Sequence, residues 1–272
     1  MDIKEAMAKK PVWKFYLPAF GVFEREVRRF FGVPIQTILA PMGSALVYFA
    51  LFGMALGQLV QGKNSHFTHG YSYLVFLIPG IMGMETLNGS FQNPVSSIMI
   101  SKWTGNLVDV LMSPISPLGL WVAYMGGALI RAFIVCFGIY VAGSVCAWQI
   151  VHVNIPLLMV AIALNVGVFA SFGVVIGSLV KTFEQSAIVS TFILQPLSFF
   201  SGVFFSFDSF PVWMQSIKYY NPVFYIVSMF RVAVLGRADT SAFVAFGVSF
   251  SFFIVVFLLS LLYLKKGFGL KN

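Results

Sequence analysis

Two charged side chains, Glu85 and Arg131, lie inside long apolar stretches of this chain. If those stretches cross a bilayer as helices, ~1.5 Å per residue places both charges at intermediate depth. An ionised group at that depth is costly and usually faces a partner or a water-filled path. Glu85 and Arg131 therefore either pair with each other or line the route of a polar or anionic molecule.

The other residues whose types could bind phosphate or a metal, or could act in catalysis, do not form a site. Residues 57–64, GQLVQGKN, nearly match a phosphate-binding loop, but Asn64 replaces the hydroxyl residue that would hold magnesium. The match also follows an apolar helix instead of a strand, so we predict no ATPase within this chain. Cys136 and Cys146 have no histidine at ligand spacing, and His66 and His69 suit a solvated loop. We therefore predict neither a metal site nor a catalytic group.

The elements that position Glu85 and Arg131 are apolar runs long enough to span a membrane. A bilayer core of about 30 Å needs ~20 apolar residues as helix, and lipid forces such segments to be helical. The fold class is therefore all-α, a polytopic membrane protein with six transmembrane helices. We predict these spans at residues 34–60, 71–100, 118–147, 155–180, 186–207 and 240–264.

Composition and charge support a membrane protein. The chain is 59% hydrophobic and 10% charged, which no ordinary soluble domain of 272 residues matches. The net charge of +8 raises the possibility of nucleic-acid binding, but the basic residues flank the apolar runs, so we predict no nucleic-acid partner. Seven Lys and Arg precede residue 34, three follow residue 264, and Lys102 and Lys181 occupy connections on the same side. Only four occupy the opposite side, so the positive-inside rule places both termini in the cytoplasm.

The N-terminal segment, residues 12–32, predicts an amphipathic helix in the cytoplasmic interface. Its expected apolar face consists of Phe20, Phe23, Val27, Phe30 and Phe31. Its expected polar face consists of Glu24, Arg25, Arg28 and Arg29, which would lie near anionic lipid headgroups.

Two connections are also predicted to be helical. Residues 102–117 form a short amphipathic helix in which Trp103, Leu107 and Leu111 share one face. That helix is either an ordinary surface helix or one that docks onto a cytoplasmic partner. Within residues 208–237 the apolar run at 223–235 is too short to span, and Asn221-Pro222 separates it from the segment before it, so we predict re-entrant helices that dip in from the outer side.

Small residues and prolines within the spans predict their packing. The Gly53-x-x-x-Gly57 and Gly173-x-x-x-Gly177 spacings let helices approach closely. Pro41, Pro79 and Pro196 are expected to bend their helices.

An ordered block after the fifth span carries a family resemblance. The block comprises residues 200–206 (FSGVFFS), Pro211-x-Trp213, Asn221-Pro222-Val223-x-Tyr225, Phe230-Arg231 and Leu235-Gly236. Gly126-Gly127…Arg131 and Asn106-Leu107…Leu111…Ser113-Pro114 also fit, although the expected acid falls one place later, at Asp109. On these residues the chain resembles the membrane permease subunits of type-2 ATP-binding-cassette (ABC) exporters over nearly all of its length.

The resemblance implies a dimer of permeases in the bacterial inner membrane, bound to two cytoplasmic ABC ATPase subunits. ATP and magnesium would belong to those partners, and this chain would hold no cofactor. The expected ATPase-coupling residues are Lys102, Trp103, Asn106, Leu107, Asp109, Leu111 and Pro114. The implied cargo is a drug or an amphipathic, lipid-linked or glycan molecule. The rival hypotheses are a self-sufficient secondary transporter and a non-catalytic membrane scaffold. A transporter of that kind should show inverted repeats and more intramembrane acids than Glu85 alone.

Overall fold

Five helices are long and apolar enough to cross a bilayer in the part of the chain that the structure describes. The structure is a computed structural model, and it describes residues 13–61, 71–106, 115–205, 215–237 and 239–267. The first of the five starts as a short π-helix, η1 (Ile35–Leu39), and continues as α3 (Ala40–Gln61). The others are α4 (Tyr73–Trp103), α6 (Pro117–Ala147), α7 (Ile155–Leu179) and α12 (Ala242–Lys266). The protein is therefore a polytopic, all-α membrane protein.

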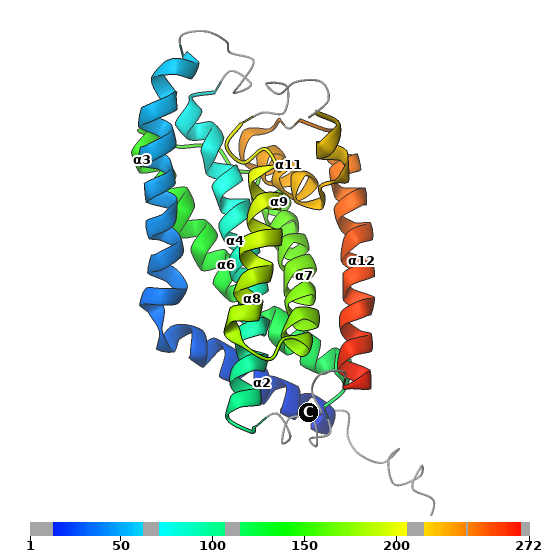
Figure 1. Cartoon of the computed structure of the whole chain (residues 1–272). Helices are drawn as coiled ribbons and strands as arrows, with labels where there is room; N and C mark the ends of the chain where they lie inside the picture. The colour runs from blue at the N-terminus through cyan, green and yellow to red at the C-terminus, as the bar shows by residue number, and fades with distance from the viewer. Residues whose placement is uncertain (1–12, 62–70, 107–114, 206–214, 238, 268–272) are drawn as a thin grey trace, which may run out of the picture.

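Helix α4 forms the centre of the bundle. It is apolar on most of its surface and is buried along most of its length, as expected for a helix at the core of a bundle. Helices α6 and α7 pack along it, whereas α3 and α12 form the two edges of the view in Figure 1 and expose most of their apolar side chains. Those exposed side chains suit a lipid environment.

Glycines allow α7 to approach α4 closely, as the small-residue spacing predicts. A Cβ at Gly173 would lie 2.4 Å from the Phe91 carbonyl oxygen and 2.7 Å from Pro94 Cγ. A Cβ at Gly177 would lie 3.1 Å from Val95 Cα. Because the first of these neighbours is backbone, only a residue without a side chain fits at Gly173.

The predicted fifth span is broken into three consecutive helical pieces. These are α8 (Phe183–Val189), the π-helix η3 (Ser190–Leu194) and α9 (Gln195–Phe199), of 7, 5 and 5 residues. The helix ends at Phe199, well before residue 207, because the chain turns over residues 200–205 and Gly202 adopts a φ of 83°. Both π-helices end two residues before a proline, Pro41 or Pro196.

A short helix, α11 (Pro222–Leu235), lies buried among α4, α7 and α12. It follows a single 3₁₀ turn, η5 (Ser216–Tyr220), and lies at the end of the bundle opposite α2 (Figure 1). The Asn221 side chain caps α11 by accepting from Val223 N, and its amide donates to the carbonyls of Leu197 and Phe200. The conspicuous Asn-Pro pair therefore ties α11 to the end of α9.

Arg231 is the most deeply buried cation of this region. Its guanidinium contacts the Asp239 carboxylate, donates to the Gly202 carbonyl and lies 4.1 Å from the centre of the Phe76 ring. Burying a charge costs free energy unless the charge is paired, and an arginine can both pair with a carboxylate and stack on an aromatic ring. The Phe230-Arg231 part of the sequence block therefore joins α11 to the turn after α9.

The N-terminal helix α2 (Trp13–Gly32) lies across one end of the bundle, where α12 also ends (Figure 1). Its buried residues are Val22, Glu26 and Phe30, spaced by four. Phe20 and Phe31 of the predicted apolar face are exposed, and a carboxylate occupies the middle of the face that packs on the bundle.

Candidate functional site

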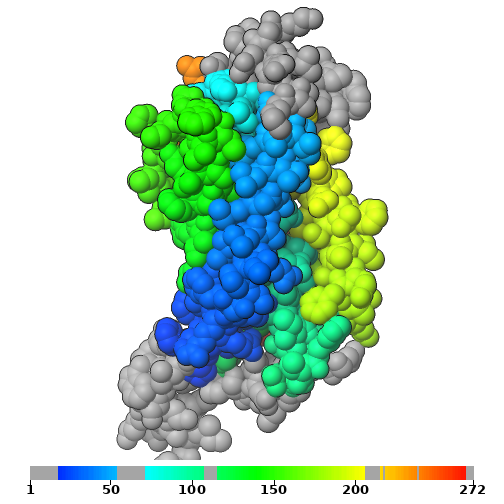
Figure 2. Space-filling view, turned by 90° about the vertical axis from the view of Figure 1, so that its left-hand side faces the viewer, coloured from blue at the N-terminus to red at the C-terminus, as the bar shows by residue number. Residues whose placement is uncertain are grey.

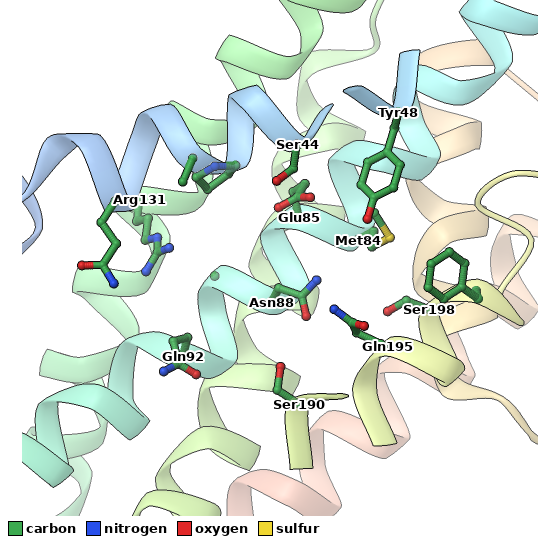
Figure 3. A pocket seen from close by; sticks show the side chains of 15 residues that line it. Ser44, Tyr48, Met84, Glu85, Asn88, Gln92, Arg131, Ser190, Gln195 and Ser198 are labelled. Carbon is green, nitrogen blue, oxygen red and sulfur yellow. The ribbon is translucent and has the colours of Figure 1, made fainter. Parts of the chain in front are cut away.

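A polar cavity of about 370 Å³ lies between α3, α4, α6 and residues 183–199 (Figure 3). On the outside of the molecule, α4 is visible along a seam between α3 and this broken helix (Figure 2). The polar side chains that line the cavity are Gln36, Ser44, Tyr48, Glu85, Asn88, Gln92, Arg131, Ser190, Gln195 and Ser198. So many polar groups inside an apolar bundle mark a place built for water or a polar ligand.

Glu85 and Arg131 both line this cavity, and the structure thereby brings together the two intramembrane charges singled out in the sequence. No ion pair within 4.0 Å joins them among the described residues, and neither has a hydrogen bond to that part of the chain. Gly89 leaves room for the arginine, because a Cβ there would lie 3.3 Å from Arg131 Nε. The cavity therefore holds a carboxyl group and a guanidinium, both available to water or to a ligand.

Helix α4 supplies one polar wall from a single face. Glu85, Asn88 and Gln92 are spaced i, i+3 and i+7, which places them in line along the helix. Gln195 lies across the cavity and points toward Asn88 (Figure 3). Sequence reasoning missed Asn88 and Gln92, although their helical spacing from Glu85 was a readable signal. It missed Gln195 because nothing in the sequence shows which helix faces α4.

A second cavity, of about 700 Å³, lies next to the first toward α2. Arg29 of α2 and Phe183 of α8 both line it. It shares Gln36, Gln92 and Arg131 with the polar cavity. Arg131 therefore stands where the two cavities meet.

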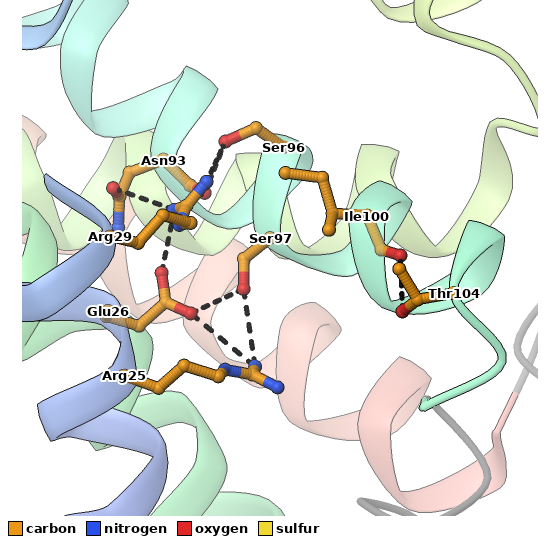
Figure 4. A network of polar contacts seen from close by, with 8 residues as sticks. All are labelled: Arg25, Glu26, Arg29, Asn93, Ser96, Ser97, Ile100 and Thr104. Carbon is orange, nitrogen blue, oxygen red and sulfur yellow. Dashed lines mark hydrogen bonds and ion pairs between the residues drawn. The ribbon is translucent and has the colours of Figure 1, made fainter. Parts of the chain in front are cut away.

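A buried polar network fixes α2 against α4 beside this second cavity (Figure 4). The Glu26 carboxylate is fully buried, accepts from Ser97 Oγ and lies 2.7 Å from Arg29 Nη2. Arg29 also donates to Ser96 Oγ at 2.6 Å and to the carbonyl and side-chain oxygens of Asn93. Gly127 makes room on α6, because a Cβ there would lie 2.8 Å from Glu26 Cβ. Sequence reasoning did not single out Glu26.

The predicted coupling segment is only partly described. Leu107, Asp109, Leu111 and Pro114 lie outside the described residues. Lys102 belongs to the last turn of α4, and its ammonium donates to the carbonyls of Ser178 and Val180 at the end of α7. Asn106 is exposed just beyond the helix.

Trp103 does not begin a new helix, as the sequence pattern suggests, but ends α4. Gly105 follows with a φ of 75°, which stops the helix, so no continuous helix links Trp103 to Leu107. The indole is 68% exposed, and its one described ring contact is an edge-on approach to Phe183 at 5.1 Å. Trp103 and Phe183 thus form an aromatic pair at the α2 end of the bundle.

Comparison with known proteins decides the family. The ABC-2 type transporter family model matches residues 20–235, which is most of the chain. This chain belongs to the ABC-2 type transporter family. The matched range runs from α2 to the end of α11 and therefore includes both cavities and the network that fixes α2.

Named relatives agree. The chain is 28% identical over 264 residues to the inner membrane transport permease YadH of Escherichia coli K12, covering 95% of this chain and 98% of that protein. It is 23% identical to nodulation protein J of Rhizobium leguminosarum bv. viciae, over 92% and 96% of the two chains. It is also 25% identical to the probable multidrug ABC transporter permease YbhR of E. coli K12, over 74% of this chain and 59% of that one. The chain is thus a membrane transport permease of a family that implies association with an ATPase subunit.

Proposed function

We propose that this chain is the permease subunit of an ATP-driven exporter, and that its cargo passes along the polar cavity. The observation that carries the proposal is a pair of charges, Glu85 and Arg131, in a polar cavity within an apolar bundle, with no ion-pair partner for either in the described part of the chain. Charges of this kind are costly in a membrane and are retained where they line a path or a ligand site.

Two cytoplasmic ATPase subunits, holding ATP and magnesium, would drive the cycle. Each would dock at the α2 end of the bundle, where Trp103 is exposed and packs edge-on against the half-buried Phe183. The cavity opens on one side of the chain, along the seam in Figure 2. A second permease copy facing that seam would close the path, so we propose a dimer.

The cargo we propose is amphipathic: a drug or a lipid-linked or glycan molecule. The cavity offers amides, hydroxyls and both charges, while Phe199 and Met84 add apolar surface. The protein would reside in the bacterial inner membrane with both termini in the cytoplasm. The basic residues flanking α2 and ending α12 support this orientation.

The proposal is tested by transport in proteoliposomes that contain the permease and its ATPase. Export should require hydrolysable ATP and should stop when the ATPase carries a substitution of its catalytic base. A secondary transporter would instead be stopped by collapsing the proton gradient and would not need the ATPase. A scaffold would transport under neither condition.

A double-variant experiment separates the two roles that remain open for Glu85 and Arg131. Glu85→Gln and Arg131→Gln should each slow export about tenfold, because each removes one charge worth ~1.4 kcal/mol to a passing polar group. The described residues show no direct ion pair between them, so we expect export in the double variant to be no faster than in either single variant. Export that recovers in the double variant would instead show that the charges pair.

Trp103→Ala should weaken ATPase association roughly 30-fold, because an exposed aromatic anchor contributes ~2 kcal/mol at an interface. Pull-down of the ATPase at graded concentrations measures the change. Trp148→Ala is the matched control. Trp148 is also an exposed tryptophan, at 94%, but it lies at the C-terminal end of α6 and not beside Trp103. Equal association by the two variants would remove Trp103 from the docking surface.

A further inference from the structure

The second cavity has an unusual balance of charge. Two arginines, Arg29 and Arg131, line its 700 Å³, and none of its described lining residues is acidic. Arg29 is paired with Glu26, but Glu26 also lies 3.5 Å from Arg25, so one carboxylate serves two guanidinium groups. Arg131 has no ion pair with any described residue. The described lining of this cavity therefore carries more positive than negative charge, and the acid beside Arg131, Glu85, lines the adjoining polar cavity.

Hydrogen-bond donors are also in excess around this cavity. Arg29 Nε, Asn93 Nδ2 and Arg131 Nε are buried and have no acceptor among the residues that the structure describes. The Asn93 amide orientation follows from its oxygen, which accepts from Arg29 Nη2 at 3.1 Å and leaves the nitrogen unused. Buried polar groups are normally paired, so three such donors beside one cavity show that this part of the described bundle has fewer oxygen acceptors than N–H donors.

The rest of the lining is apolar and lies beside the interfacial helix. Phe30, Ile100 and Phe183 line the cavity with the arginines. Helix α2 carries Arg29, and an amphipathic interfacial helix lies at the depth of lipid headgroups. The cavity therefore offers a charged site and an apolar surface to the same molecule, at the level where an amphiphile's head would lie.

We propose that this cavity binds the oxyanion head, a phosphate or a carboxylate, of an amphipathic molecule, with Arg131 as its principal partner. The proposal rests on the proposed function and deepens it, because Arg131 also borders the polar cavity through which the cargo would pass. An oxyanion held by Arg131 and Arg29 would stand at the entrance of that cavity. A guanidinium suits this role because its planar fork binds two oxygens at once.

Binding to the purified permease in a neutral detergent, without the ATPase, tests the proposal. The probes for calorimetry are dihexanoyl phosphatidic acid, dihexanoyl phosphatidylcholine and inorganic phosphate. Arg131→Gln should weaken phosphatidic acid binding about 10- to 100-fold, the range for losing one hydrogen bond between charged groups. Arg131→Lys should weaken phosphatidic acid binding less, because lysine keeps the positive charge but lacks the planar guanidinium that binds two oxygens.

Arg28→Gln is the matched control. Arg28 lies one residue from Arg29 on α2, but it is exposed and pairs with Glu24 at 2.6 Å. Ile100→Trp is a second variant that removes no charge: it narrows the cavity and should also weaken binding of phosphatidic acid. Thermal unfolding of each variant shows whether it is folded.

The outcomes distinguish the sources of the anion. Arg131-dependent binding of phosphatidic acid alone assigns the site to an amphiphile head, and equal dependence for inorganic phosphate assigns it to a free anion. Binding unchanged by both Arg131→Gln and Ile100→Trp, or weakened equally by Arg28→Gln, would overturn the proposal. So would equal, Arg131-dependent binding of the phosphatidylcholine. If ATP-driven export occurs but no anion binds, the anion site is rejected and the proposed function stands. If an anion binds but ATP does not drive export, the proposed function is rejected and the anion site stands.

Discussion

Glu26→Gln should lower the free energy needed to open α2 away from the bundle by about 3 kcal/mol, because breaking a buried ion pair leaves uncompensated charge. The Glu26 carboxylate is fully buried and serves Arg29, Ser97 and Arg25 together. The glutamine keeps the shape but removes the negative charge between the two arginines. Hydrogen–deuterium exchange over residues 20–32 measures this local opening.

Glu24→Gln on the same helix supplies the control. Its ion pair with Arg28 is exposed on both sides, with side-chain exposures of 47% and 80%. Pairs of this kind contribute ~0–0.5 kcal/mol. If both variants speed exchange equally, the net charge of α2, and not the buried Glu26 carboxylate, holds the helix against the bundle.

Gly173→Ala should destabilise the whole bundle by about 2–3 kcal/mol, the cost of forcing an atom into a packed core. The new methyl group would meet the Phe91 carbonyl and the Pro94 ring, so α4 and α7 would have to separate along their shared contact. Unfolding of the purified permease in mixed micelles, followed by circular dichroism, measures the loss.

The same substitution at Gly247 should act in the opposite direction. Nothing lies within 4 Å of a Cβ at Gly247, within α12. An alanine there should stabilise the protein by up to ~1 kcal/mol, because it is the better helix former. If Gly173→Ala matched Gly247→Ala, the close approach of α4 and α7 would carry no energetic weight.

Apolar runs predict where helices lie because the bilayer sets their length. The helix bounds of α6, Pro117–Ala147, and α7, Ile155–Leu179, differ by one residue from the runs at 118–147 and 155–180. The same reasoning failed at residues 200–205. These residues are as apolar as those of a membrane-spanning helix, but the chain turns there instead of continuing as a helix. The turn depends on the amide of Asn221, 21 residues away from its partner Phe200, and hydropathy carries no trace of that contact.

The candidate site was predictable only through its charges. Glu85 and Arg131 stand out in sequence because their neighbours are apolar. Gln195 and Arg29 become site residues only when the broken helix and α2 are placed beside α4. The buried role of Glu26 could not be predicted, because a glutamate on an amphipathic helix resembles a surface residue until its partners on α4 are known.

The two π-helices give the walls of the polar cavity a way to change. Each π-turn holds one more residue than an α-turn, and each lies just before a proline on opposite sides of the cavity. Moving that extra residue along the helix rotates the side chains it passes by about 100° and advances them about 1.5 Å. Gln36 and Ser190 lie in these segments. Such a screw motion would exchange the groups facing the cavity while almost every backbone hydrogen bond stays made, so the lining can be swapped without pulling the helices apart.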